Sequence, residues 1–401
     1  SVEDGFVQRS EFNVQIFYFS LSLIAVGVGF LKANISTLVG SLYSSNDSRR
    51  DSGFTIFYMG INIGAFIATL LCAYVGEVYG WRFGFGLAGI GMVFGLLTFH
   101  FGKFFLGDIG LPPNKDLLNK AFFGIRLEKI IYILSLMFVV FIWGLIQLSQ
   151  GLGLILFFLG FFAVSWIIWF SLKKCNKSDR NNMFAMLILM AFSILFWALF
   201  EQAASSITLF TDRNINMGSF FTAGMFQALN PLFIIFLAPL FAVFWGFLSK
   251  KGIEPSTSSK FGFAILQVGL GFLVLVFGSQ YADSEGRVAV VFLVFMYLLH
   301  TMGELCLSPV GLSMVTKLSV PKIVGMMMGV WFLSSSFAAY VSGWIASLMA
   351  IENYNSDIVG SLDSLGIYLN VFGKLAFIAI SVGIFLLIIS PILSKLINTR
   401  S

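Results

Sequence analysis

Long apolar runs separated by short polar segments fill the 401-residue chain. Most runs are long enough to cross a hydrocarbon layer of about 30 Å as a helix, and their pattern is not the alternation of a barrel strand. The two short runs between 130 and 172 are joined by little more than Gln150 and Gly151, which predicts a tight helical hairpin. The eleven runs predicted to form membrane-spanning helices are 14–41, 53–76, 81–105, 130–148, 152–172, 183–211, 220–249, 260–280, 286–317, 321–350 and 367–397.

Composition supports an all-α membrane protein. Apolar residues make up 58% of the chain and charged residues 11%, whereas a soluble domain carries about 25% charged residues. These values exclude an ordinary soluble globular protein and a disordered chain. The three cysteines, Cys72, Cys175 and Cys306, are far apart in sequence and form no CxxC pattern, so neither a metal site nor a disulfide is expected.

The distribution of charge predicts an orientation. If the N-terminus lies outside and the runs alternate, most of the 24 Lys and Arg residues fall in inner loops, as the positive-inside rule requires. The C-terminus is then cytoplasmic, and the net charge of +5 needs no nucleic-acid partner. Because the sequence contains neither a GxxxxGK[ST] phosphate loop nor an HExxH zinc helix, we expect neither an enzyme nor a bound cofactor or metal.

Ionisable groups at membrane depth are costly and mark functional sites. Lys32 and Glu304 both lie inward of the middle of their runs, so they are natural partners. Their pairing is either a static buried ion pair or a breakable inner gate that also holds a charged end of a substrate.

Glu201 lies outward of the middle of its run, and no basic residue of the chain lies at its depth. Such an isolated carboxylate takes up a proton more readily than one in water. It is therefore a candidate proton carrier, a partner for a cationic substrate or for an arginine outside this sequence, or a neutral structural acid.

Three further residues are candidates for a polar cavity. Asn230 lies at an outward depth similar to that of Glu201, just before Pro231, where a proline would bend the helix. Asn62 lies near the middle of its run between glycines, so it either bridges helices or faces a cavity. Trp331 lies among serines and a glycine, and it either lines a cavity or packs in the core.

Several of these residues fall in segments that resemble one family. The segments are DSRRDSGF at 47–54 with FYMGINIGAF at 57–66, GFLKAN at 29–34, FWALFEQ at 196–202, NPLFI at 230–234, GELCLSPVGLS at 303–313 and GVWFL at 329–333. In their order along the chain they resemble the proton-dependent oligopeptide transporter (POT) family of the major facilitator superfamily. The extra hairpin resembles the two-helix insertion of bacterial members, which implies a multi-pass protein of the bacterial inner membrane.

The resemblance also implies a domain organisation. The first run corresponds to the fourth helix of the family's twelve-helix core, so three core helices and the Glu-rich proton motif of the first helix are expected to be missing from this chain. Residues 1–105 would be the remainder of the N-terminal bundle, containing core helices 4–6. Residues 106–182 would form a linker with the inserted hairpin, and residues 183–401 a C-terminal six-helix bundle.

The resemblance implies proton-coupled symport of di- and tripeptides by alternating access, with protons as the coupling ion. Lys32 would hold the peptide carboxylate and pair with Glu304 across the inner gate. The peptide amino terminus would bind Glu201, Asn230 and Asn62, and Trp331 would wall a side-chain pocket. We expect a monomer in a lipid bilayer. The alternatives are another solute on the same scaffold (nitrate, a modified amino acid or a drug) and a receptor or scaffold that does not transport.

Overall fold

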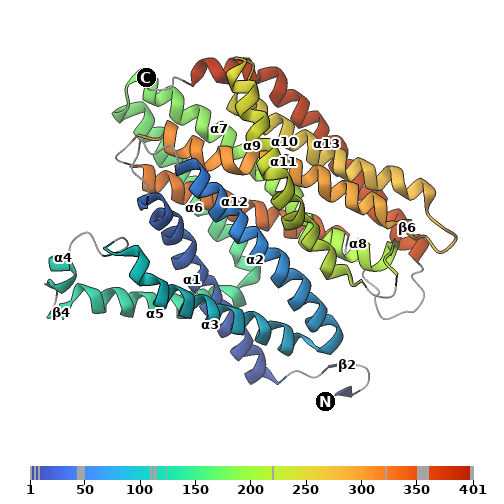
Figure 1. Ribbon diagram of the computed structural model, residues 1–401, viewed down its shortest axis with the longest axis horizontal. Helices are drawn as coiled ribbons and strands as arrows, with labels where there is room; N and C mark the ends of the chain where they lie inside the picture. The colour runs from blue at the N-terminus through green and yellow to red at the C-terminus, as the bar shows by residue number, and fades with distance from the viewer. Residues whose placement is uncertain are drawn as a thin grey trace. The chain divides into compact units, whose positions relative to one another are not determined.

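The computed structural model describes residues 2–3, 6–7, 10–42, 50–108, 111, 115–122, 124–218, 221–320, 323–349 and 361–397, which are almost entirely helical (Figure 1). The α-helices are α1 (Glu11–Ser41), α2 (Arg50–Tyr79), α3 (Trp81–Leu106), α4 (Lys115–Asn119), α5 (Leu127–Gln147), α6 (Ser149–Lys174), α7 (Lys177–Phe200), α8 (Ser206–Asn214), α9 (Leu229–Lys250), α10 (Thr257–Gly278), α11 (Val290–Leu318), α12 (Val324–Ser347) and α13 (Ser361–Leu396). The 3-10 helices are η1 (Glu201–Ala204), η2 (Ala223–Ala228) and η3 (Ser279–Tyr281).

Strands are confined to three two-residue pairs among the described residues. β1 (Val2–Glu3) pairs with β2 (Phe6–Val7), and β3 (Ala121–Phe122) pairs with β4 (Ile125–Arg126), both antiparallel. β5 (Ile215–Asn216) and β6 (Val288–Ala289) pair in parallel and join the chain beyond α8 to the start of α11. The prediction of an all-α fold is therefore confirmed.

The predicted apolar runs correspond to the long helices. In the described part of the chain, ten helical stretches are long and apolar enough to cross a membrane. α12 is not among these ten stretches. The predicted hairpin is confirmed: α5 and α6 are separated by Leu148 alone.

Two of the predicted runs are not single α-helices. The run 183–211 breaks after α7 and continues through η1 into α8, and the run 220–249 begins with η2 before α9 starts. Pro231 was expected to bend its helix, but it lies in the first turn of α9. Amide groups in a first turn have no partner within the helix, so a proline is tolerated there.

The described chain divides into two compact units. One comprises 1–58 and 91–155, and the other comprises 59–90 and 156–401. This division cuts through α2, α3 and α6, so it groups residues by proximity and does not test the predicted boundaries at 105 and 182. Those boundaries stay a prediction.

In the first unit, α1 packs against α5. Gln15 Nε2 on α1 donates to Gln147 Oε1 on α5 over 2.9 Å. Many other side chains of α1 and α5 are apolar and exposed. This is the surface that a bilayer solvates, because apolar side chains gain nothing by leaving lipid.

The second unit contains a hydrophobic core formed by α7, α10, α11 and α13. Phe210 of α8 and Phe272 of α10 both contact Phe372 of α13, each with ring centroids 5.4 Å apart. α10 packs along both α11 and α13, which run beside it in Figure 1.

Glycines bring α10 and α13 close together. A Cβ added to Gly269 would lie 2.8 Å from Ala379 Cβ, and one added to Gly383 would lie 2.8 Å from the backbone nitrogen of Leu266. Real Cβ atoms do not approach other atoms so closely, so glycine is required at both positions for this packing.

Candidate functional site

A buried polar cluster joins α9 to α11. Asn230 Nδ2 donates to Glu304 Oε2 over 2.8 Å and to Thr301 Oγ1 over 3.1 Å. Glu304 is 8% exposed, and Thr301 Oγ1 donates in turn to the Tyr297 carbonyl over 2.7 Å. A carboxylate, an amide and a hydroxyl thus meet inside a largely apolar helical unit, where polar groups are kept only if they are paired or functional.

The start of α9 explains how Asn230 reaches this cluster. η2 is a tighter 3-10 segment that ends at Ala228, and α9 begins at Leu229. Asn230 is therefore in the first turn of α9, at the junction between two helix types. Depth counting placed Asn230 outward and Glu304 inward and did not pair them, whereas their side chains are in hydrogen-bond contact.

A second polar cluster lies where α7 ends. Glu201 is the first residue of η1 and is half-buried, and its neighbour Gln202 is fully buried. Gln202 Nε2 lies 3.1 Å from the Ser342 carbonyl and 3.0 Å from Ser342 Oγ on α12. The turn that carries Glu201 is thus attached to a second helix.

Lys32 and Asn62 are not joined to these clusters by the described contacts. Lys32 lies on α1, but its side chain lies outside the described residues. Lys32 and Glu304 also belong to different compact units, so their ion pair stays a prediction. Asn62 on α2 is 6% exposed, and its predicted contact with substrate is untested.

Trp331 is buried between α12 and α11. A Cβ on Gly311 would overlap the six-membered ring of Trp331, so this glycine makes room for the indole. Ser334 Oγ donates to the Trp331 carbonyl over 2.6 Å, a bond within its own helix. The Ser334 hydroxyl thus has its hydrogen-bond partner within α12. The predicted role of Trp331 as a pocket wall stays a prediction.

Sequence reasoning missed Thr301, Ser342 and the surroundings of Lys260. Thr301 lies three residues before Glu304 and therefore on the same face of α11, so helical spacing was the available signal. Lys260 is the first residue of the predicted run 260–280, and it is buried, pairs with Glu254 and lies 4.6 Å from the Trp245 ring centroid.

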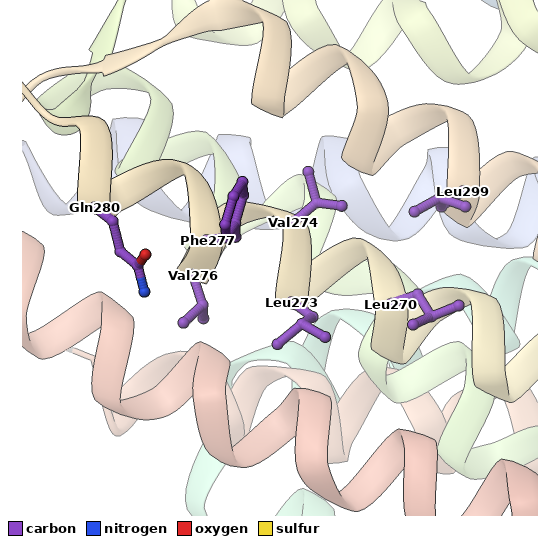
Figure 2. Close-up of a pocket in the computed structure, with 7 residues that line it drawn as sticks. All are labelled: Leu270, Leu273, Val274, Val276, Phe277, Gln280 and Leu299. Carbon is purple, nitrogen blue, oxygen red and sulfur yellow. The ribbon is translucent and has the colours of Figure 1, made fainter.

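A hydrophobic groove lies apart from these polar groups. It has a volume of about 480 Å³ and is lined from α10 and η3, with one residue from α11 (Figure 2). The lining residues are Leu270, Leu273, Val274, Val276, Phe277, Gln280 and Leu299. This lining suits acyl chains better than a charged solute, and it includes none of the candidate site residues.

These features define a multi-pass α-helical membrane protein with polar groups buried in its apolar interior. The sequence pattern of the POT family matches residues 4–359. The chain belongs to the POT family, a family of peptide transporters rather than enzymes, and its fold is that of the major facilitator superfamily.

Individual relatives agree with this assignment. The chain is 36% identical over 388 residues to the "uncharacterized transporter YclF" of Bacillus subtilis (strain 168), covering 94% of this chain and 74% of that protein. It is 33% identical over 396 residues to "dipeptide and tripeptide permease A" of Cronobacter turicensis, covering 97% and 76%. A crystal structure of a peptide transporter POT mutant in complex with alafosfalin has a TM-score of 0.75 and 32% identity, covering 97% and 76%.

Proposed function

We propose that this protein is a proton-coupled symporter that imports di- and tripeptides across the bacterial inner membrane by alternating access. Its membership of the POT family and the names of its relatives support this function. The observation that carries the proposal is the buried pair formed by Asn230 and Glu304. A carboxylate beside an amide, sheltered from water, suits the ammonium group of a peptide.

The hydrogen bonds of Asn230 leave an acceptor for that ammonium. Its Nδ2 is used toward Glu304 and Thr301, so its Oδ1 is the atom that can accept from a substrate N–H. Glu304 supplies the opposite charge, which makes the bond charge-assisted. Selection by the terminal groups allows the peptide side chains to vary.

The remaining site residues contact the substrate carboxylate, its amino-terminal end or its side chains. Lys32 binds the peptide carboxylate, and it pairs with Glu304 when no peptide is present. Asn62 adds a polar contact at the amino-terminal end, and Trp331 walls the side-chain pocket. These roles rest on the family resemblance of their sequence segments, in particular GFLKAN at 29–34 and GVWFL at 329–333.

Glu201 is the proton-carrying group of this proposal. Taking up a proton removes its charge, which changes the free energies of the inward- and outward-facing states by different amounts. The proton is therefore the coupling ion, and no other cofactor is needed.

The proposed transporter has its C-terminus in the cytoplasm, because most Lys and Arg residues then lie in inner loops. We take the transporter to be a monomer.

Uptake of labelled dialanine into proteoliposomes tests the function. We expect accumulation when the outside is acidic and little accumulation without a pH gradient. Glu201→Gln should abolish the gradient-driven part. Lack of uptake by correctly inserted protein would favour a receptor or scaffold, and uptake of nitrate but not of dialanine would favour another solute on the same scaffold.

A further inference from the structure

The helix that carries Glu201 is interrupted at a specific place. α7 ends at Phe200, η1 spans Glu201–Ala204, and α8 starts at Ser206. Ser205 between them has φ −129° and ψ −94°, outside the helical region. Hydropathy continues through this break as one span from Lys177 to Asn214, so the interruption lies within the membrane-spanning part of the chain.

Gln202 connects the three pieces that meet at this break. Its Nε2 lies 3.0 Å from the Ala198 carbonyl in the last turn of α7. Its Oε1 accepts from Ser206 Oγ at the start of α8. The same Nε2 reaches across to both the carbonyl and the hydroxyl of Ser342 on α12. One fully buried amide thus spans the break and attaches it to a neighbouring helix.

The partner helix is suited to transmit movement. α12 packs along α7 and against η1, and Ser342 is buried at this contact. A buried amide that lost these partners would leave unpaired polar groups, which is costly at this depth. We therefore expect η1 and α12 to move together rather than to separate.

Other ionisable groups on the elements packed around η1 are few among the described residues. Asp212 and Arg213 lie at the opposite end of α8, and Tyr340 is the titratable side chain of α12. His300 of α11 has its ring 6.1 Å from that of Phe200. Arg213 Nη1 donates to Tyr368 Oη on α13 over 3.0 Å. The Gln202 amide is a connection from the break to α12.

We propose that Gln202 is a positioning residue for proton coupling: it fastens the turn that carries Glu201 to α12, so that a change of charge at Glu201 moves α12 with it. This inference rests on the proposed function, because it assumes that Glu201 carries the proton. It predicts that breaking the Gln202–Ser342 connection uncouples proton uptake from peptide movement without abolishing peptide movement.

Two variants break the connection to different extents. Gln202→Met keeps the length and volume of the side chain but removes its hydrogen bonds. Ser342→Ala removes the hydroxyl and keeps the backbone carbonyl, so it should act in the same direction with a smaller effect. Ser193→Ala and Ser334→Ala are matched controls, because each removes a buried hydroxyl that bonds to a carbonyl of its own helix.

The experiment compares two transport modes in proteoliposomes. One is uptake of labelled dialanine driven by a pH gradient, and the other is exchange of labelled for unlabelled dialanine at equal pH. For Gln202→Met we expect the ratio of driven uptake to exchange to fall about tenfold, the scale expected when buried hydrogen bonds are lost. The two serine controls should keep the ratio of the unchanged protein.

Three results would decide against the inference. An unchanged ratio in Gln202→Met would overturn it directly. Equal losses of both modes in Gln202→Met and in Ser342→Ala, together with a lowered unfolding temperature, would assign Gln202 a purely structural role. If Gln202→Met does not fold, the ratio in Ser342→Ala decides alone, and an unchanged ratio there contradicts the inference.

A different result would count against the proposed function. It fails if the unchanged protein shows exchange but no driven uptake.

Discussion

Replacing Glu304 by glutamine should weaken binding of a free dipeptide far more than binding of an N-acetylated one. The substitution keeps the shape of the side chain and an oxygen for Asn230, but it removes the negative charge. Acetylation removes the positive charge of the peptide. If the two charges meet in the bound state, either change alone should cost affinity, and the second change should then cost little.

The magnitude follows from the burial of the site. Glu304 is 8% exposed and 2.8 Å from Asn230 Nδ2, so water does not screen it as it would a surface carboxylate. A hydrogen bond to a charged group contributes about 1.5–3 kcal/mol net. A tenfold change in Kd corresponds to about 1.4 kcal/mol. Loss of the bond between Glu304 and the peptide ammonium should therefore weaken dialanine binding by one to two orders of magnitude.

Calorimetric titration of dialanine and N-acetyl-dialanine into the unchanged protein and into Glu304→Gln measures this coupling. We expect a coupling energy of at least about 1 kcal/mol, within the range found for residues in contact. The same cycle with Glu201→Gln distinguishes the two carboxylates as partners of the ammonium. An equal acetylation penalty in the unchanged protein and in Glu304→Gln would refute the assignment of the amine site to Glu304.

Two further substitutions test the packing. Gly269→Ala should destabilise the protein by about 1–3 kcal/mol, as overpacking does, because its Cβ would lie 2.9 Å from a backbone atom of α13. The control Gly246→Ala meets nothing within 4 Å and should leave the unfolding temperature unchanged or raise it. Equal effects of the two substitutions would contradict the close packing. Lys260→Met should lower the free energy of unfolding, measured in urea, by about 1–2 kcal/mol. This loss is smaller than for a fully buried pair, because Glu254 is partly exposed. The exposed Lys251→Met should have little effect.

Much of the fold was predictable because each long helix is also a long apolar run. The hairpin of α5 and α6 was predicted from two short apolar runs with very few residues between them. Such a short connection leaves room for only a tight turn between the two helices. The break at Glu201 was not predictable from hydropathy, because the apolar character continues through η1 as one candidate span from Lys177 to Asn214. Its cue was the pair of serines at 205 and 206, which is common in ordinary membrane helices as well.

The candidate site residues could be singled out from the sequence, but the contact between Asn230 and Glu304 could not. Asn230, Glu201 and Glu304 stand out because polar groups are rare at membrane depth. The contact between Asn230 and Glu304 depends on where α9 begins, and residue counting does not show that the 3-10 helix η2 precedes it. The surroundings of Lys260 were not predictable either, because nothing in the sequence pattern shows that the chain folds this charge against Trp245.

Peptide-driven proton movement tests the central claim most directly. Proteoliposomes are loaded with a pH-sensitive dye and held at equal pH on both sides, and dialanine is then added outside. We predict acidification of the interior that requires Glu201 and that N-acetyl-dialanine elicits weakly at the same concentration. Entry of labelled dialanine with no change in internal pH would contradict proton-coupled symport.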